Sequence, residues 1–206
     1  MKDSTIGSWL AELGDRTPTP GGGGAAALLA ATGAALVGMV SAYTTGGKWA
    51  DREDAMRAVK AEADELRATA LDLAAADAEA FATVGMAYGL PRESDEDKAV
   101  RREAIQSALV GAAQPPAEVG RLAARVVELA DGLVERGNPN VVSDVAVAAS
   151  SAAAALEAAI VNIEINAAAI KDEAYVAQLR GQVEELTAAI ERARGVVARV
   201  REGLRG

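Results

Sequence analysis

The segment TPTPGGGGAAALLAATGAALVGMVSAYTTGG, residues 17–47, decides the fold class of this chain. A proline-flanked run of four glycines leads into about twenty residues that carry no charge. Alanine is the commonest residue among them, and it combines the highest helix propensity with a small side chain that lets helices pack closely. We therefore predict a buried helix from about Gly24 to Tyr43 that ends at residues 44–47.

A phosphate-binding loop and a membrane span are two other structures that this segment suggests. The glycines are not followed by Gly-Lys-Ser/Thr, and they lack the GxGxxG spacing of a dinucleotide fold. The helix is long enough to cross a bilayer, but Ala, Gly, Ser and Thr are near neutral on insertion scales. A buried core helix therefore fits this composition better than a phosphate-binding loop or a membrane span. The glycine run is then either a flexible connector or a loop whose backbone closely approaches an anion or a carbonyl group.

Composition indicates a single all-α domain. The 206 residues are enough for one sizeable core, and no obvious linker divides them. Half of the residues are apolar but only 3% are aromatic, whereas a sheet would favour Val, Ile and aromatic side chains. We predict one all-α domain over residues 1–206, a bundle of about seven helices with two Ala-rich helices at its centre.

Charge and missing residue types restrict the function. The net charge of -9 opposes nucleic-acid binding, which needs a surface rich in Lys and Arg. The chain has no cysteine and no histidine, so we predict no metal site and expect any catalysis to use carboxylates, Lys, Tyr, amides or the backbone. Residues 1–13 lack a signal-peptide pattern, and a cytoplasmic location is the default expectation.

Periodicity and helix breakers predict the helix boundaries. Ser94 with the three acids after it is typical of a helix N-terminus, and Ser4 is a possible cap of the first helix. Pro115 and Pro116 are expected to separate two helices. The expected helices cover about residues 4–13, 24–43, 51–88, 94–112, 117–136, 141–170 and 172–204. Because Ala-rich faces bury little area per residue, we also expect a homodimer or a higher oligomer.

Asp77 is the one charged residue on an otherwise apolar stripe of the third helix. At about 100° per residue, the stripe consists of Val59, Ala63, Leu66, Ala70, Leu73, Asp77, Phe81, Val84 and Tyr88. Desolvation on such a stripe would raise the pKa of a carboxyl towards that of a useful general base or acid. Asp77 is therefore either catalytic or a structural carboxylate satisfied by a buried amide or Arg.

A line of polar residues marks the helix that follows GNPNVVSD. Four of them fall within roughly 40° of one another: Asp144, Ser151, Asn162 and Asn166. Small residues lie between them, while Glu157 and Glu164 fall on the opposite side. The line is either a strip that binds a ligand or a ladder of hydrogen bonds between helices.

Five motifs follow one another along nearly the whole chain. They are TPTPGGGGAAA at residues 17–27, DAEAFATVGMAYGLP at 77–91, KAVRREAIQSAL at 98–109, GNPNVVSDVAVAA at 137–149 and NIEINAAAIKD at 162–172. In these motifs the chain resembles the cyclodeaminase/cyclohydrolase family of folate enzymes. The resemblance implies an all-α fold that dimerises, with a tetrahydrofolate site near the dimer interface. Gly24 is a departure, because the family commonly has Ser there.

The resemblance also implies one of two related reactions. In cyclodeamination, N10 of 5-formiminotetrahydrofolate attacks the amidine carbon and ammonia leaves, which gives 5,10-methenyltetrahydrofolate. In cyclohydrolysis, water attacks the methenyl carbon and the ring opens to 10-formyltetrahydrofolate. Neither reaction needs a metal or a redox cofactor.

On this resemblance, Asp77 or Asp144 is the candidate general base that accepts a proton from N10 or from the attacking water. The candidate substrate-binding residues are Asn138, Asn162 and Asn166 at the pterin edge, Pro20, Gly21, Gly22, Gly23 and Gly24 against its flat face, and Lys98, Arg101 or Lys171 at the glutamate tail. The alternative is a non-catalytic helical folate-binding or assembly protein on the same scaffold.

Overall fold

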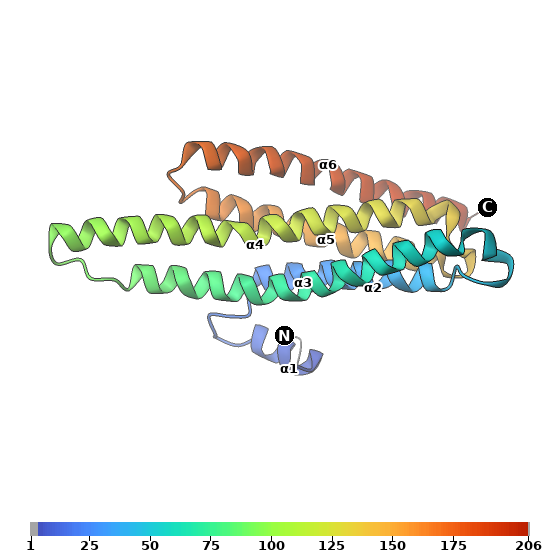
Figure 1. Ribbon diagram of the computed structural model, residues 1–206, viewed down its shortest axis with the longest axis horizontal. Helices are drawn as coiled ribbons and strands as arrows, with labels where there is room; N and C mark the ends of the chain where they lie inside the picture. Colours follow the sequence, from blue (N-terminus) through green and yellow to red (C-terminus); the bar gives the residue numbers. More distant parts are fainter. Residues whose placement is uncertain (1–3, 206) are drawn as a thin grey trace.

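The computed structural model describes residues 4–205, which form six α-helices and two short 3-10 helices, with no strand in this range. In chain order the elements are α1 (Ile6–Leu13), α2 (Gly22–Ala42), η1 (Gly47–Arg52), α3 (Glu53–Tyr88), α4 (Asp95–Arg136), η2 (Pro139–Val141), α5 (Val142–Ala167) and α6 (Glu173–Gly203) (Figure 1). The predicted all-α class is confirmed, with one α-helix fewer than expected.

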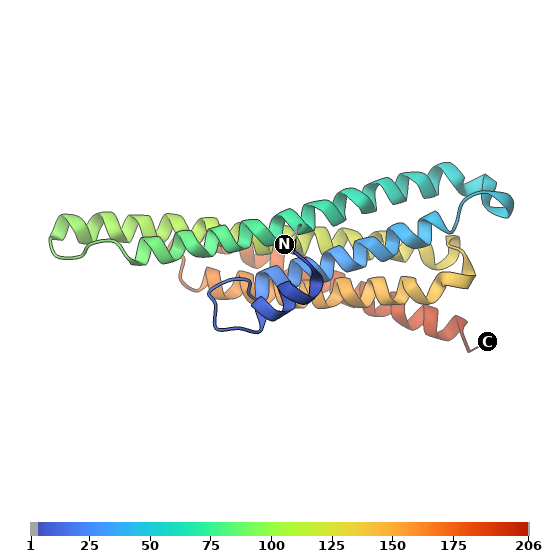
Figure 2. The same cartoon turned by 90° about the horizontal axis from the view of Figure 1, so that it is seen from below.

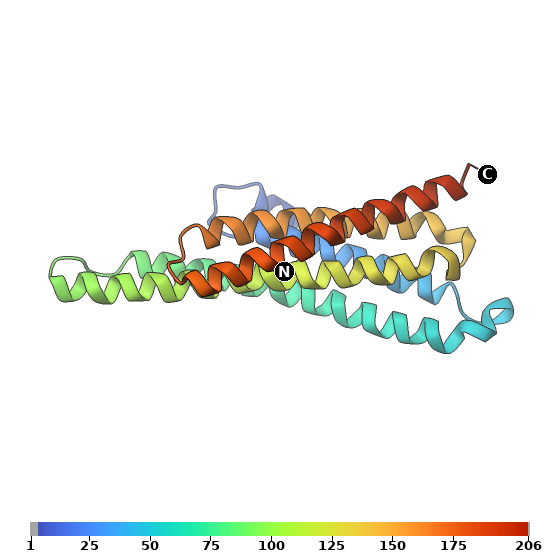
Figure 3. The ribbon, with the colours of Figure 1, turned by 90° about the horizontal axis from the view of Figure 1, so that it is seen from above.

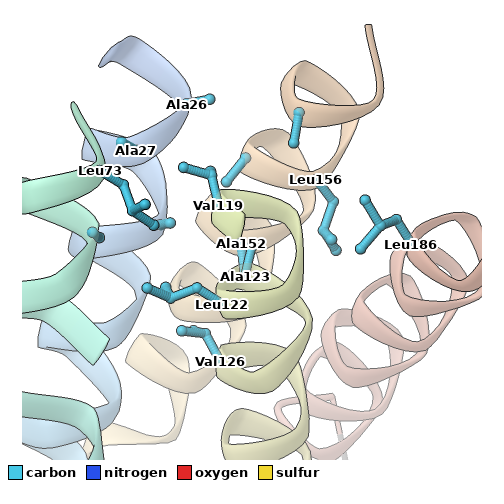
Figure 4. Packing of buried hydrophobic residues seen from close by; sticks show 14 of the residues in the cluster. Ala26, Ala27, Leu73, Val119, Leu122, Ala123, Val126, Ala152, Leu156 and Leu186 are labelled. Carbon is cyan, nitrogen blue, oxygen red and sulfur yellow. The ribbon is translucent and has the colours of Figure 1, made fainter. Parts of the chain in front are cut away.

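Helices α2, α4 and α5 pack against one another at the centre of the bundle, with α3 against α2 and α4, and α6 against α4 and α5 (Figure 3). Side chains from α2 to α6 meet in this core (Figure 4). Helices α2 and α5 approach closely at Gly33, where a Cβ would lie 3.0 Å from the carbonyl oxygen of Ala148 and 3.2 Å from Cγ1 of Val126 of α4. Small residues therefore set the helix spacing.

The helices run past one another so that the bundle has two distinct ends. At one end, the side-chain Nδ2 of Asn138 donates to the carbonyl oxygen of Tyr43 at 2.9 Å, which joins the end of α2 to the connection between α4 and α5. At the other end, α2 begins beside α1 (Figure 2), and the α3–α4 hairpin extends beyond it (Figure 1). Phe81 and Tyr88 lie on this hairpin and are 55% and 52% exposed, so the predicted stripe is buried only where α2 lies opposite it.

Helix α4 continues through Pro115 and Pro116, so the predicted break there is wrong. Both prolines are buried, and the carbonyl oxygen of Ala112 that Pro116 leaves without a donor accepts a hydrogen bond from Asn166 of α5. Packing and this outside donor offset the missing backbone bond. The predicted cap at Ser94 is confirmed by reciprocal hydrogen bonds with Asp97, whereas Thr5 rather than Ser4 caps α1.

Helix α2 and the segment Pro139–Ala167 are long and apolar enough to cross a membrane by length and composition alone. In α2, 56% of the most apolar stretch is buried inside the bundle. The three-way packing of α2 with α4 and α5 accounts for that apolar composition, as expected for a core helix.

Candidate active site

The first turn of α2 is made of glycine. The helix begins at Gly22, after Gly21 in an extended conformation, so the expectation of a loop up to Gly24 is wrong by two residues. The first N–H groups of a helix have no partner within it, and α2 has no side-chain cap of its own. The turn therefore presents backbone donors to whatever packs against it.

Asp77 of α3 packs against this turn. Its carboxylate accepts a hydrogen bond from the backbone N–H of Gly24. A Cβ on Gly23 would overlap Oδ1, Oδ2 and Cγ of the same carboxyl group. Glycine at position 23 is thus what allows the carboxylate to approach the helix start, and Asp77 is satisfied by a backbone amide rather than by a cation.

The pKa of Asp77 is raised above its usual value because burial disfavours the charged form, although the N–H of Gly24 acts in the opposite direction. Four other described carboxyls have shifted pKa values, and all four are lowered: those of Glu53, Glu62, Asp64 and Asp97. Asp77 alone among them is shifted towards the range in which a carboxyl can take up and release a proton.

Asn162 reaches the same place from α5. Its Nδ2 lies 3.9 Å from the position that a Cβ on Gly22 would occupy and donates to the carbonyl oxygen of Ala158 at 2.8 Å. Three helices therefore contribute to one site: the glycine turn of α2, Asp77 of α3 and Asn162 of α5. The sequence placed all three groups in its candidate set.

Two residues that were not among the candidates from the sequence lie at the edge of this site. Phe81, one turn after Asp77 on α3, is 55% exposed. Because Phe81 lies on an apolar stripe, the sequence predicted that it is buried. The pattern could not show that α2 does not extend far enough to cover it. Trp9 of α1 is buried against the other side of the turn, where its Cζ2 lies 3.6 Å from the position of a Cβ on Gly24, and Pro20 lies beside it at 3.8 Å.

Asn166 is one turn beyond Asn162, but its amide is directed towards α4. Nδ2 donates to the carbonyl oxygens of Ala112 at 3.2 Å and Asn162 at 2.9 Å. The interpretation of the polar line as hydrogen bonds between helices thus holds for Asn166. Both of its amide hydrogens are used inside the protein.

Asn138 and Asp144 lie at the other end of the bundle, so they are not brought together with Asp77 in one chain. Asn138 binds the end of α2 and caps η2, which occupies its amide with backbone partners. Asp144 is in the first turn of α5, and at 1.5 Å per residue it is about 27 Å along the helix from Asn162. Rotation about the helix axis placed Asp144 and Asn162 on one line but said nothing of this axial separation.

The predicted basic residues lie away from the glycine turn. Lys98 forms an ion pair with Asp95 at 2.9 Å. Arg101 donates from Nη2 to the carbonyl oxygen of Tyr88 at 3.1 Å and lies over the ring of Tyr88. Tyr88 is about 16 Å along α3 from Asp77. Lys171 is exposed between α5 and α6. These groups suit only a long ligand that extends from the turn.

Residues 5–185 match the family model described as formiminotransferase-cyclodeaminase. The chain belongs to this family. It is 39% identical over 187 residues to a methenyltetrahydrofolate cyclohydrolase from Methylorubrum extorquens, with 90% of each chain covered. It is 31% identical to the formimidoyltransferase-cyclodeaminase of Rattus norvegicus, of which it spans 35%.

A solved structure has the same fold. The formiminotetrahydrofolate cyclodeaminase from Thermotoga maritima superposes with a TM-score of 0.88 at 30% identity, covering 100% of this chain and 99% of that one. The family therefore connects the chain with folate one-carbon enzymes of two activities, cyclohydrolase and cyclodeaminase.

Two adjacent glycines give a matched test of the turn. We expect Gly23→Ala to lower the free energy of unfolding by about 1 kcal/mol, because the new Cβ displaces the Asp77 carboxylate. Gly24→Ala should raise it by about 0.5–1 kcal/mol, because its Cβ meets Trp9 at ordinary contact distance and Ala favours the helix. Urea unfolding of both variants measures the difference, and equal effects would contradict the assigned contact.

Asp77→Asn should change stability in a pH-dependent way. The pKa of Asp77 is raised in the folded protein, so its ionised form is favoured less there than in the unfolded chain. Wild-type stability relative to the variant should therefore fall as pH rises from the unfolded value of about 3.9 through the folded pKa. We expect the variant to be the more stable protein at pH 7 and to lose that advantage near pH 3.5–4, measured by urea unfolding at several pH values. An advantage that grew towards low pH would show that the pKa is lowered.

Proposed function

We propose that this chain catalyses one-carbon chemistry on tetrahydrofolate, with Asp77 as the general base. The observation that supports this most directly is a carboxyl with a raised pKa held at the glycine start of α2 in a member of this family. Hydrolysis of 5,10-methenyltetrahydrofolate is the first reaction to test, because the relative at 39% identity over 90% of both chains is named as a cyclohydrolase. Cyclodeamination of 5-formiminotetrahydrofolate is the second, given the fold match.

The proposed role of Asp77 is to accept and return protons while bonds to the one-carbon unit form and break. In cyclohydrolysis, the ionised Asp77 takes a proton from water as the oxygen attacks the methenyl carbon, which leaves a hydroxyl on that carbon. The protonated carboxyl then gives its proton to N5 as the C–N5 bond breaks, and the hydroxyl proton is released to solvent as the formyl carbonyl forms. In cyclodeamination, the same carboxylate takes the N10 proton as N10 attacks the amidine carbon, and ammonia leaves after protonation. A positioned carboxylate contributes about 10²- to 10⁴-fold as a general base.

The surroundings of Asp77 suit a flat ligand. The turn at Gly22 has no side chains, Phe81 is half exposed one helical turn away, and the side-chain oxygen of Asn162 has no hydrogen-bond partner among the described residues. We propose that the pterin lies against the glycine turn, stacks on Phe81 and hydrogen-bonds to Asn162. Arg101, Lys98 and Lys171 are the candidates for the glutamate tail.

The proposal includes no redox cofactor, because neither reaction changes an oxidation state, and no metal, because Asp77 is proposed to carry out the proton transfers. Among residues 4–205, no group of three or more Asp or Glu side chains is placed to hold a metal ion. The proposed location is the cytoplasm, in keeping with a chain that has no cysteine to form disulfides.

We also propose a homodimer through the outer face of α2 and α5. Val147, Val161 and Ile165 lie within roughly 40° on α5 and are 50%, 62% and 69% exposed, and Leu29 of α2 is 36% exposed. In the segment that contains α5, only 39% of the most apolar stretch is buried. An apolar face of this kind on an otherwise charged protein is typical of a subunit interface.

Asp77→Asn tests the general base. We expect it to lower kcat for methenyl- or formiminotetrahydrofolate by about 10²- to 10⁴-fold while the helical content by circular dichroism stays unchanged. The absorbance of the methenyl group measures turnover. Glu79→Gln, an exposed carboxylate on the same helix, is the control and should keep activity within a few-fold.

Two results would redirect the proposal. Retained activity in Asp77→Asn together with its loss in Asp144→Asn would move the base to the other end of the bundle. Calorimetric titration of the wild-type chain with tetrahydrofolate derivatives separates the non-catalytic alternative, because binding without turnover would support a folate-binding protein. No binding at all would rule out the folate function.

Val161→Lys tests the dimer. We expect the wild-type chain to sediment with a mass of twice the 20.9 kDa of the monomer. Val161→Lys should sediment as a monomer, because a lysine buried at the centre of the interface is unfavourable. Val100→Lys changes a similarly exposed valine on the hairpin and should leave the dimer intact. A wild-type monomer in sedimentation velocity would contradict this interface.

A further inference from the structure

The proline pair in α4 leaves two backbone carbonyls, those of Gly111 and Ala112, without their helical donors. In an α-helix the carbonyl oxygen of residue 112 accepts from the N–H of residue 116, and Pro116 has no N–H. The surrounding turn is in the core, since Ala113, Pro115 and Pro116 are all buried. Ala112 itself is half-buried, and a carbonyl group left unpaired away from water costs about as much as a lost hydrogen bond, so a donor from outside α4 stabilises this turn.

Asn166 is that donor. Its Nδ2 reaches across from the last turn of α5 to the carbonyl oxygen of Ala112 at 3.2 Å. Its second amide hydrogen goes to the carbonyl oxygen of Asn162 at 2.9 Å, one turn back on the same helix. One side chain thus links the proline turn of α4 to the backbone at Asn162.

The link continues into the candidate active site. Asn162 lies beside Gly22, and the next residue, Gly23, is the one whose missing Cβ admits the Asp77 carboxylate. The order of contacts is therefore Ala112, Asn166, Asn162, the glycine turn and Asp77. A shift of the last turn of α5 along its axis would move Asn162 away from the glycine turn.

We propose that Asn166 is a positioning residue, not a substrate ligand: by satisfying the carbonyl that Pro116 leaves free, it holds the last turn of α5 in the register that places Asn162 at the active site. The catalytic part of this inference rests on the proposed function, whereas the pairing of Asn166 with Pro116 does not. The proline pair that the sequence suggested as a helix break is then part of the support of the site.

A double-mutant cycle on stability tests the pairing without any substrate. Asn166→Ala should lower the urea midpoint of the wild-type chain, because the carbonyl of Ala112 loses its donor. In a Pro116→Ala background the same change should lower it clearly less, because the restored N–H at position 116 can bond to that carbonyl. Equal shifts in the two backgrounds would overturn the pairing.

Activity tests the positioning. Asn166→Ala should lower kcat/KM by about tenfold, since a misplacement of about 1 Å can reduce rates by about 10²-fold. Adding Asn166→Ala to Asn162→Ala should reduce kcat/KM by less than about twofold further, because the residue it positions is already gone. Wild-type activity in Asn166→Ala, or fully additive losses, would overturn the proposal.

A control variant separates positioning from general support. Gln182 of α6 donates from Nε2 to the carbonyl oxygen of Ala117 in the next turn of α4, at 2.6 Å. Gln182→Ala removes a comparable bond to α4 and should lower stability while leaving kcat/KM unchanged. An equal loss of activity in both variants would mean that Asn166 acts only through stability. If the wild-type chain turns over neither folate, the proposed function fails, and the stability cycle alone decides the pairing with Pro116.

Discussion

The contact between the Asp77 carboxylate and the first turn of α2 is the constraint on which the candidate site depends. A helix that begins with glycines has free N–H groups and no side chain to cap them. Asp77 supplies an acceptor from another helix, and it can do so only because position 23 lacks a Cβ. Burial then raises its pKa, so the interaction that completes the helix start also leaves a carboxyl suited to proton transfer. One contact serves both structure and chemistry.

Close packing of small residues makes that contact possible. Gly33 and the alanines of α2 and α5 let these two helices approach each other to backbone distance, and the bundle is held by many short contacts rather than by large side chains. The valines and isoleucine on the outer face of α5 are exposed, and this is the face through which we propose that two copies of the chain pair.

The amides of the chain illustrate how one residue type takes several roles in a helical bundle. Asn138 closes the connection at the end of α2, Asn162 lies beside the glycine turn, and Asn166 bridges α5 to the proline turn of α4. At Asn138 and Asn166 the amide bonds to a carbonyl at a helix end or at the proline turn.

Residue types and their spacing determined the all-α class and most helix boundaries. They also marked three candidates: the glycine run at Gly22 to Gly24, Asp77 as the one carboxylate on an apolar stripe at 3.6 residues per turn, and Asn162 on the polar line of its helix. The capping pair at Ser94 and Asp97 was also local and therefore predictable. Only the tertiary structure decided that α4 passes through Pro116, because the donor that allows it comes from a residue fifty positions later. It also separated Asp144 from Asp77 and exposed Phe81, since helical rotation describes which residues share a face but not how far along the axis a neighbouring helix covers them.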